Sequence, residues 1–272
     1  MTADRTEFAL DRALQLQALD DSTSHWRAGV TTDYCNTPKA AFGGWINALA
    51  YRAIASHSDS RGTLQTMQTS FMGGLAEGDV TIKARLLVSR RATDFWRVDM
   101  MQNDALMVSA QLVFGLPRKS GPEVQIAMPE AAPAEESQPL EPAPPLTPLW
   151  MGQYRQWLAR GTPFRVNPRP ESWLWIQDRD ERPLDLPGLI AMVDAPMPRT
   201  FFVDSQLRMG STIQMQNHVV ATPEQIAAAG AKPIMLRADS SSIANGFYDQ
   251  RVDAWSADGQ LLMISNQMAA HR

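Results

Sequence analysis

Three polar side chains stand where the sequence is otherwise apolar, and their types suit the handling of a water molecule. Asp194 follows the apolar run "LIAMV", where a carboxylate is costly to bury unless it has partners or a task. Gln267 interrupts the final stretch "LLMISNQMAAHR", and its amide offers both a donor and an acceptor. Thr212 adds a hydroxyl within "GSTIQMQNHV". A carboxylate shielded from water is a better base, so such a set fits general-base activation of water.

Each of these residues also has a simpler explanation. Asp194 precedes Ala-Pro, and it can merely end a helix because residues before proline leave helical geometry. Gln267 can be a solvated residue of an edge strand, and Thr212 fits a strand by β propensity alone. Ser211 is a second candidate for the hydroxyl, although it should face the other side of the strand from Thr212.

The composition is that of a globular protein without a basic surface. The chain has 272 residues and a formal net charge of -4, with a pI near 5.6, which disfavours nucleic acid and anionic membranes as partners. Cys35 is the only cysteine, so no intrachain disulfide can form. The start "MTADRTEFALDR" lacks the pattern of a signal peptide, and no run approaches the roughly 20 apolar residues of a membrane span. We therefore expect a soluble, cytoplasmic protein.

A proline-rich segment divides the chain. Residues 117–148 combine many prolines with Ala and Glu, and proline resists both helix and sheet because it fixes φ and lacks a backbone donor. This composition predicts an extended linker between an N-terminal domain, residues 1–116, and a C-terminal domain, residues 149–272.

The two halves repeat one order of elements. The segments "RVDMMQNDALMVSAQ" (97–111) and "RVDAWSADGQLLMISNQ" (251–267) both begin Arg-Val-Asp and end Ser-x-Gln, which aligns Gln111 with Gln267. The pattern predicts a strand, an apolar helix and four further strands in each half. The expected ranges are 24–34, helix 42–56, 64–73, 79–90, 94–102 and 105–114, then 172–180, helix 184–195, 211–220, 233–241, 246–256 and 260–270.

Both predicted helices are apolar on most of their faces. Such a helix must be covered on most sides, and a curved antiparallel sheet with polar residues on its outer side can do this. The expected class is α+β, with two repeats that each wrap a curved antiparallel sheet around a central helix.

This layout resembles the hotdog fold, and its doubling resembles the double-hotdog acyl-CoA thioesterases of the bacterial thioesterase II type. The resemblance rests on five stretches, and it follows the order of both halves but leaves out the proline-rich segment. They are "FGGWINALA" (42–50), "TMQTSFMGGLAEGD" (66–79), "WIQDRDERPLDLPGLIAMVDAPMP" (175–198), "GSTIQMQNHV" (210–219) and "DGQLLMISNQMAAHR" (258–272).

The resemblance implies a hydrolytic site made by an Asp, a Thr or Ser, and a Gln, which here would be Asp194, Thr212 and Gln267. They would hold a water that attacks an acyl-CoA thioester directly, with no cofactor or metal. The chain departs from the family where Ile-Gln-Met follows Thr212 instead of the frequent Asp-His pair. Ala50 aligns with Asp194, so one site per chain is expected. Proteins of this kind often pair, which implies a homodimer.

Five other residues are candidates for substrate contacts. Backbone N–H groups of Gly43 and Gly44, at the start of a helix, could face the oxyanion, although a glycine pair can equally serve helix–sheet packing. Arg90 and Arg91 could bind a CoA phosphate, or form a solvated strand end. Phe71 could line an apolar slot for the acyl chain.

Two other functions stay open at this point. One is a non-catalytic acyl-CoA or acyl-carrier binding protein, which the absence of the Asp-His pair favours. The other is a hotdog hydratase, which is disfavoured because Asp20 and His25 have the right spacing but precede a strand. The sequence has no Gly-x-Ser-x-Gly elbow, no P-loop and no metal-ligand spacing of its histidines.

Overall fold

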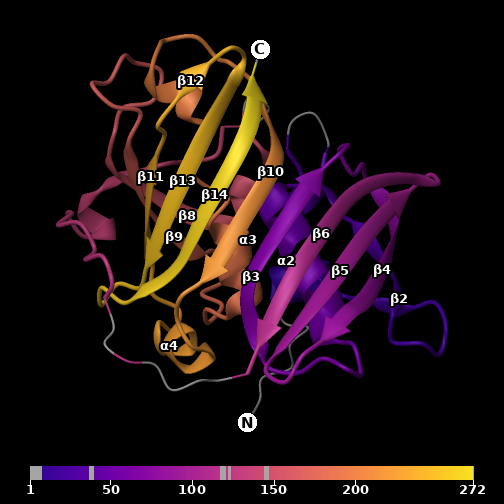
Figure 1. Ribbon diagram of the computed structural model, residues 1–272. Helices are drawn as coiled ribbons and strands as arrows, with labels where there is room; N and C mark the ends of the chain where they lie inside the picture. Colours follow the sequence, from indigo (N-terminus) through magenta and orange to yellow (C-terminus); the bar gives the residue numbers. More distant parts are fainter. Residues whose placement is uncertain (1–7, 37–39, 117–120, 122–123, 144–146, 272) are drawn as a thin grey trace. The chain divides into compact units, whose positions relative to one another are not determined.

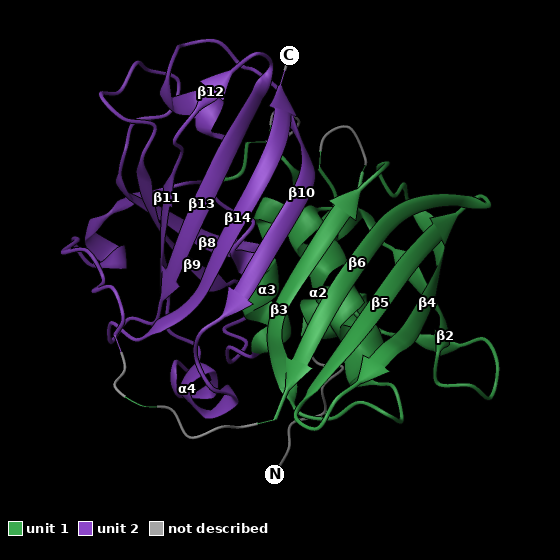
Figure 2. Cartoon of the chain, in the orientation of Figure 1, with its two compact units in different colours: residues 1–123, 142–153, 186–191 green, residues 124–141, 154–185, 192–272 purple. Residues whose placement is uncertain are grey.

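The computed structural model describes residues 8–36, 40–116, 121, 124–143 and 147–271. By its contacts the chain divides into two compact units (Figure 2). Unit 1 comprises residues 1–123, 142–153 and 186–191, and unit 2 comprises residues 124–141, 154–185 and 192–272. The proline-rich segment is thus shared between the units, and the domain limits drawn from the sequence stay a prediction.

Unit 1 contains an antiparallel sheet and one long helix (Figure 1). The strands follow the order β1-β2-β4-β5-β6-β3. Helix α2 contacts β4, β5 and β6. The elements are α1 Ala9–Ala13, β1 Gln17–Ala18, β2 His25–Val30, η1 Thr32–Tyr34, α2 Gly43–Ala55, β3 Thr63–Phe71, β4 Gly78–Ser89, β5 Thr93–Gln102, β6 Ala105–Gly115 and η3 Leu149–Gln153.

Unit 2 contains a second antiparallel sheet, in the order β10-β14-β13-β11-β9-β8-β7, with β12 paired to β13. Helix α3, Leu186–Met192, is an exception, because its residues up to Ala191 belong by contacts to unit 1. The other elements are η2 Ala134–Glu136, β7 Gln138–Pro139, β8 Tyr154–Arg160, β9 Ser172–Asp178, η4 Arg199–Phe202, β10 Gly210–Val219, α4 Pro223–Ala228, β11 Ile234–Asp239, β12 Ile243–Ala244, β13 Phe247–Trp255 and β14 Leu261–His271.

Burial explains why these segments form their elements. In β5 every second residue is buried, which is the period of a strand with one covered face. Helix α2 is buried along nearly its whole length, as expected of a helix that is apolar on most sides. These features confirm the predicted α+β class with antiparallel sheets.

The sequence prediction was wrong at one helix and one strand, and it also missed the short helices α1 and α4. The helix predicted over 184–195 is shorter, because α3 spans Leu186–Met192 and the Ala-Pro that follows Asp194 opposes helical geometry. Strand β8, Tyr154–Arg160, was missed, although its alternation of buried and less buried residues is visible once the sheet is known.

Part of the proline-rich segment packs on the sheet of unit 2. The indole Nε1 of Trp175 donates to the carbonyl of Ala132 at 2.9 Å, and that of Trp255 donates to the carbonyl of Ile126 at 3.2 Å. Ala134 is buried in the same apolar cluster as the two tryptophans. Residues 124–141 therefore cover one face of this sheet, in addition to connecting the two halves of the sequence.

Among the residues that the structure describes, none forms a helix both long and apolar enough to cross a membrane.

Gly44 gives a test of helix packing in unit 1. A Cβ built on Gly44 would overlap the carbonyl oxygen of Ala191 and the ring of Phe42, so Gly44→Ala should lower the free energy of unfolding by about 1–3 kcal/mol. Gly29→Ala is the matched control, because a Cβ there meets no atom within 4 Å. Urea unfolding of both variants measures the effect, and equal midpoints would contradict the close packing of α2 on α3.

Candidate active site

Asp194 lies just past the C-terminal end of α3. It is half-buried in a turn where the backbone N–H of Ala195 donates to the carbonyl of Met192 at 3.0 Å. Pro196 and Pro198 follow and restrict the backbone of this segment. The acid is therefore carried by a loop, and not by the helix that the sequence predicted.

A bulge in β10 turns Thr212 toward the face of Gln267. Side chains alternate between the faces of a strand, so Thr212 and Met215, three residues apart, should face opposite sides. Against β14, however, Thr212 pairs with Ala269 and Met215 pairs with Gln267, because Ile213 is an extra residue. The bulge thus places the hydroxyl and the amide on one face, which we call the inner face.

Ser211 does not reach this face. It pairs with Ala270 and is exposed. Of the two hydroxyls considered from the sequence, only that of Thr212 lies beside Gln267.

A chain of hydrogen bonds joins the three residues predicted to be catalytic. Thr212 Oγ1 donates to Gln267 Oε1 at 2.7 Å, and Gln267 Nε2 donates to Asp194 Oδ1 at 3.4 Å. The amide is thereby oriented, with its oxygen toward the hydroxyl and its nitrogen toward the carboxylate. The second contact is long for a hydrogen bond between an amide and a carboxylate.

The matching strands of unit 1 have the same bulge without the polar residues. In β3 the bulge follows Leu64, as it follows Thr212 in β10. Three residues after Leu64, Met67 of β3 pairs with Leu112 of β6. Three residues after Thr212, Met215 of β10 pairs with Gln267 of β14. Both leucines are fully buried. The first half therefore has apolar side chains at the positions where the second half has the hydroxyl and the amide.

The alignment of Gln111 with Gln267 was wrong. Gln111 pairs with Arg97 across β5 and is exposed, whereas Gln267 pairs with Gln250 across β13. A shift of one residue moves a strand side chain to the other face of the sheet. The Ser-x-Gln match contains such a shift, so it aligned an outward side chain with an inward one.

The residues predicted to contact substrate all belong to unit 1. Gly43 and Gly44 open α2, Phe71 ends β3, and Arg90 and Arg91 are exposed in the turn between β4 and β5. Their substrate roles stay predictions. In the part of the chain that the structure describes, no group of three or more His, Cys, Asp and Glu is placed to hold a metal ion.

Two family models match the sequence. Residues 31–115 match the acyl-CoA thioesterase N-terminal domain, and residues 129–270 match the acyl-CoA thioesterase C-terminal domain. The chain belongs to the acyl-CoA thioesterase family. Membership supports thioester hydrolysis as the general activity. No curated protein sequence matches the chain.

Solved structures confirm the double-hotdog fold of this acyl-CoA thioesterase family member. A conserved hot dog protein from Alicyclobacillus acidocaldarius is 26% identical, with a TM-score of 0.90 over 97% of this chain and 98% of the other. A proposed thioesterase II from Thermobifida fusca is 18% identical, with a TM-score of 0.83 over 97% and 98% of the chains. Acyl-CoA thioesterase II TesB2 from Mycobacterium marinum is 16% identical, with a TM-score of 0.75 over the same shares.

Sequence reasoning missed two buried polar residues beside the three residues predicted to be catalytic in this acyl-CoA thioesterase family member. Arg199 has no exposed surface, and Gln250 is 2% exposed. Arg199 Nε donates to Gln250 Oε1 at 2.9 Å, and Gln250 lies directly opposite Gln267. Arginine is almost never fully buried, so no sequence pattern pointed to Arg199.

The inner face carries a further polar pair next to Gln267. Asn217 and Ser265 face each other across β10 and β14, two residues along from Gln267, and both are buried. Among the described residues, neither the Asn217 amide nor the Ser265 hydroxyl has a hydrogen-bond partner. Burying such groups unpaired costs about 1–3 kcal/mol each, so this pair lowers the free energy of unfolding.

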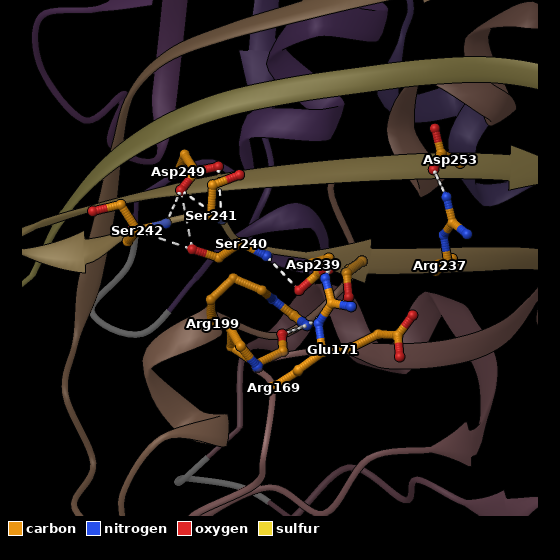
Figure 3. A network of polar contacts seen from close by, with 12 residues as sticks. Arg169, Glu171, Arg199, Arg237, Asp239, Ser240, Ser241, Ser242, Asp249 and Asp253 are labelled. Carbon is orange, nitrogen blue, oxygen red and sulfur yellow. Dashed lines mark hydrogen bonds and ion pairs between the residues drawn. The ribbon is translucent and has the colours of Figure 1, made fainter.

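The repeated Arg-Val-Asp phrase has a structural role on the opposite face. Arg97 Nε donates to Asp99 at 2.9 Å in β5, and Arg251 Nη2 donates to Asp253 at 2.9 Å in β13. Asp253 also accepts from Arg237 of β11 at 2.6 Å (Figure 3). In both halves the phrase forms an arginine–aspartate pair on the face that does not carry Gln267.

Ser265→Ala tests the cost of polar groups on the inner face. Ala110 is the counterpart of Ser265 in β6, so an alanine fits the strand, and the variant should raise the free energy of unfolding by about 1 kcal/mol. Ser109→Ala is the contrasting control, because the Ser109 hydroxyl donates to Asp99 Oδ1 at 2.6 Å and its loss should be destabilising. Denaturant unfolding separates the two, and a destabilised Ser265→Ala would show that its hydroxyl is satisfied.

Proposed function

We propose that this protein hydrolyses acyl-CoA thioesters by direct attack of a water held by Asp194, Gln267 and Thr212. The observation that carries the proposal is the hydrogen-bonded chain from Thr212 through Gln267 to Asp194. These residues come from two strands and a loop, and their contacts link an acid, an amide and a hydroxyl on the inner face. Family membership supports the thioester as the bond that is cleaved.

Asp194 is the base in this reaction. Its carboxylate accepts a proton from the water while the water oxygen bonds to the thioester carbonyl carbon. The tetrahedral intermediate then expels the CoA sulfur, and the proton on Asp194 passes to that sulfur. The products are a carboxylic acid and free CoA, and no covalent acyl-enzyme forms. A positioned general base contributes a factor of about 10²–10⁴ to such a rate.

Gln267 and Thr212 position the water and the acid. The Gln267 amide nitrogen donates to Asp194, which holds the carboxylate in a fixed orientation toward the water. Thr212 fixes the orientation of the amide by donating to its oxygen. Uncharged groups can do this without competing with Asp194 for the proton, and positioning of reactants supplies much of the acceleration in such reactions.

Thiol release from acyl-CoAs tests the reaction and its base together. The purified protein is incubated with acyl-CoAs from acetyl to palmitoyl, and free thiol is followed with a thiol reagent. Asp194→Ala should lower kcat by about 10²–10⁴-fold, because the water loses its base. The dependence of kcat/KM on chain length then identifies the substrate class.

Asp180→Asn serves as the control for this experiment. Asp180 is exposed in the turn that follows β9, and its variant should keep the rate of the unchanged protein. Thiol release that survives Asp194→Ala would refute Asp194 as the base. Acyl-CoA binding without thiol release from any substrate would instead support a non-catalytic binding protein.

Thr212→Val and Ser211→Ala form a second matched pair. Valine keeps the shape of threonine but removes the donor to Gln267 Oε1, so kcat should fall by about 10-fold as the amide loses its orientation. Ser211 faces away from Gln267, and its variant should retain full activity. Steady-state kinetics of both decides the assignment, and a larger loss in Ser211→Ala would reverse it.

A further inference from the structure

Arg199 is a buried cation whose acceptors are all uncharged. Its guanidinium donates to the carbonyls of Met197, Pro170 and Ala238, to the hydroxyl of Ser172 and to the amide oxygen of Gln250, at distances of 2.5 to 3.2 Å. The side chain also lies over the ring of Phe202, 4.6 Å from its centroid. Among the residues that the structure describes, no carboxylate forms an ion pair with it; the charge of Asp239 favours its charged form, but Asp239 pairs with Arg169 at 3.1 Å.

Stability alone does not account for this arginine. A buried charge is costly to remove from water, and apolar replacements of buried ionic groups are often neutral or stabilising. Arg182, the other well-buried arginine of unit 2, has the expected compensation, because Asp185 accepts from it at 2.6 and 2.7 Å. Burial lowers the pKa of Arg199 to about 9, so the side chain is still charged at neutral pH.

The hydrogen bonds of Arg199 connect the loop that carries Asp194 with the strand next to Gln267. On one side it donates twice to the carbonyl of Met197, three residues after Asp194 on the same loop. On the other side it donates to Gln250, which lies opposite Gln267 in the sheet. The guanidinium therefore connects the loop that carries Asp194 with the strand beside Gln267. Asp194 Oδ1 and Gln267 Nε2 are 3.4 Å apart.

The first half has different residues at the two positions that match Gln250 and Gln267. There Trp96 of β5 pairs with Leu112 of β6, whereas Gln250 of β13 pairs with Gln267 of β14. Trp96 and Leu112 are both fully buried. In the first half, a tryptophan and a leucine therefore fill these two positions. In the second half Gln250, which accepts from Arg199, takes the place of the tryptophan.

We propose that Arg199 is a positioning residue of the hydrolytic site, which holds the Asp194 loop against the sheet so that the carboxylate meets Gln267. This inference rests on the proposed function for its kinetic consequence. Arg199 does not touch the water or the thioester, and acts through Met197 and Gln250. Its loss should therefore displace Asp194 and affect turnover more than substrate binding.

The kinetic test compares Arg199→Met and Arg199→Lys with the unchanged protein. Methionine keeps much of the volume but donates nothing, so kcat should fall by about 10- to 100-fold, while KM changes by less than about threefold. Lysine keeps the charge and one set of donors, and should restore part of the loss. An unchanged kcat in Arg199→Met would overturn the proposal, and so would a change confined to KM.

Arg182→Met is the matched control. It removes a buried arginine from the same unit, at the other end of α3 from Asp194, and should lower the melting temperature without lowering kcat at 20 °C. An equal loss of kcat in Arg182→Met would show that the loss in Arg199→Met comes from general destabilisation. That result would overturn the proposal. If Arg199→Met does not fold, Gln250→Leu breaks the contact to the sheet with Arg199 in place, and should lower kcat by a smaller factor.

A structural measurement separates this inference from the proposed function. The side-chain amide signals of Gln267, assigned in NMR spectra with Gln267→Ala, report its contact with Asp194 without substrate. Arg199→Met should shift them in the same direction as Asp194→Ala, and Arg182→Met should leave them in place. Unmoved signals in Arg199→Met would refute the positioning role. Thiol release absent from the unchanged protein would refute the hydrolysis instead.

Discussion

The geometry of the site depends on one extra residue in β10. Without the bulge at Ile213, strand alternation would place Thr212 on the face opposite Gln267. The same bulge follows Leu64 in β3, where no hydroxyl is present. The distortion therefore belongs to the fold of each half, and the second half gains a polar inner face by substitution alone. The bulge is present in both repeats, and only in β10 does it bring a hydroxyl beside an amide.

The two halves differ at the positions of Thr212 and Gln267. Leu64 and Leu112 show that the two positions can be filled with buried leucine, so Thr212 and Gln267 are not needed to build the strands. Buried polar groups without a partner in the described part of the chain add a cost in both halves, as Asn217 does in β10 and Thr69 does at the matching position of β3. Functional sites are where local rules of folding are broken, so the contrast between the repeats at these two positions agrees with the proposed role of Thr212 and Gln267.

The sequence predicted most strands and both polar groups that interrupt apolar runs, because strand and helix periods are local properties. Asp194 and Gln267 stand out for this reason, whereas their catalytic roles come from the family resemblance and stay predictions. Periodicity does not reveal a bulge, so the sequence could not show that Thr212 lies on the face of Gln267, and a one-residue shift misaligned Gln111. Arg199 was missed because its burial depends on carbonyls and side chains brought together only by tertiary structure.

The three groups of the site are held with unequal rigidity. Thr212 and Gln267 lie in paired strands whose ladders fix the backbone on both sides, whereas Asp194 lies on a loop with few backbone bonds of its own. The precision of the site is therefore limited by this loop. Pro196 and Pro198 reduce its freedom, but proline cannot anchor a loop to a sheet. A multidentate donor can, and Arg199 contacts three different strands of that sheet. The cost of burying its charge is reasonable where a displacement of about 1 Å can lower a rate by about 100-fold.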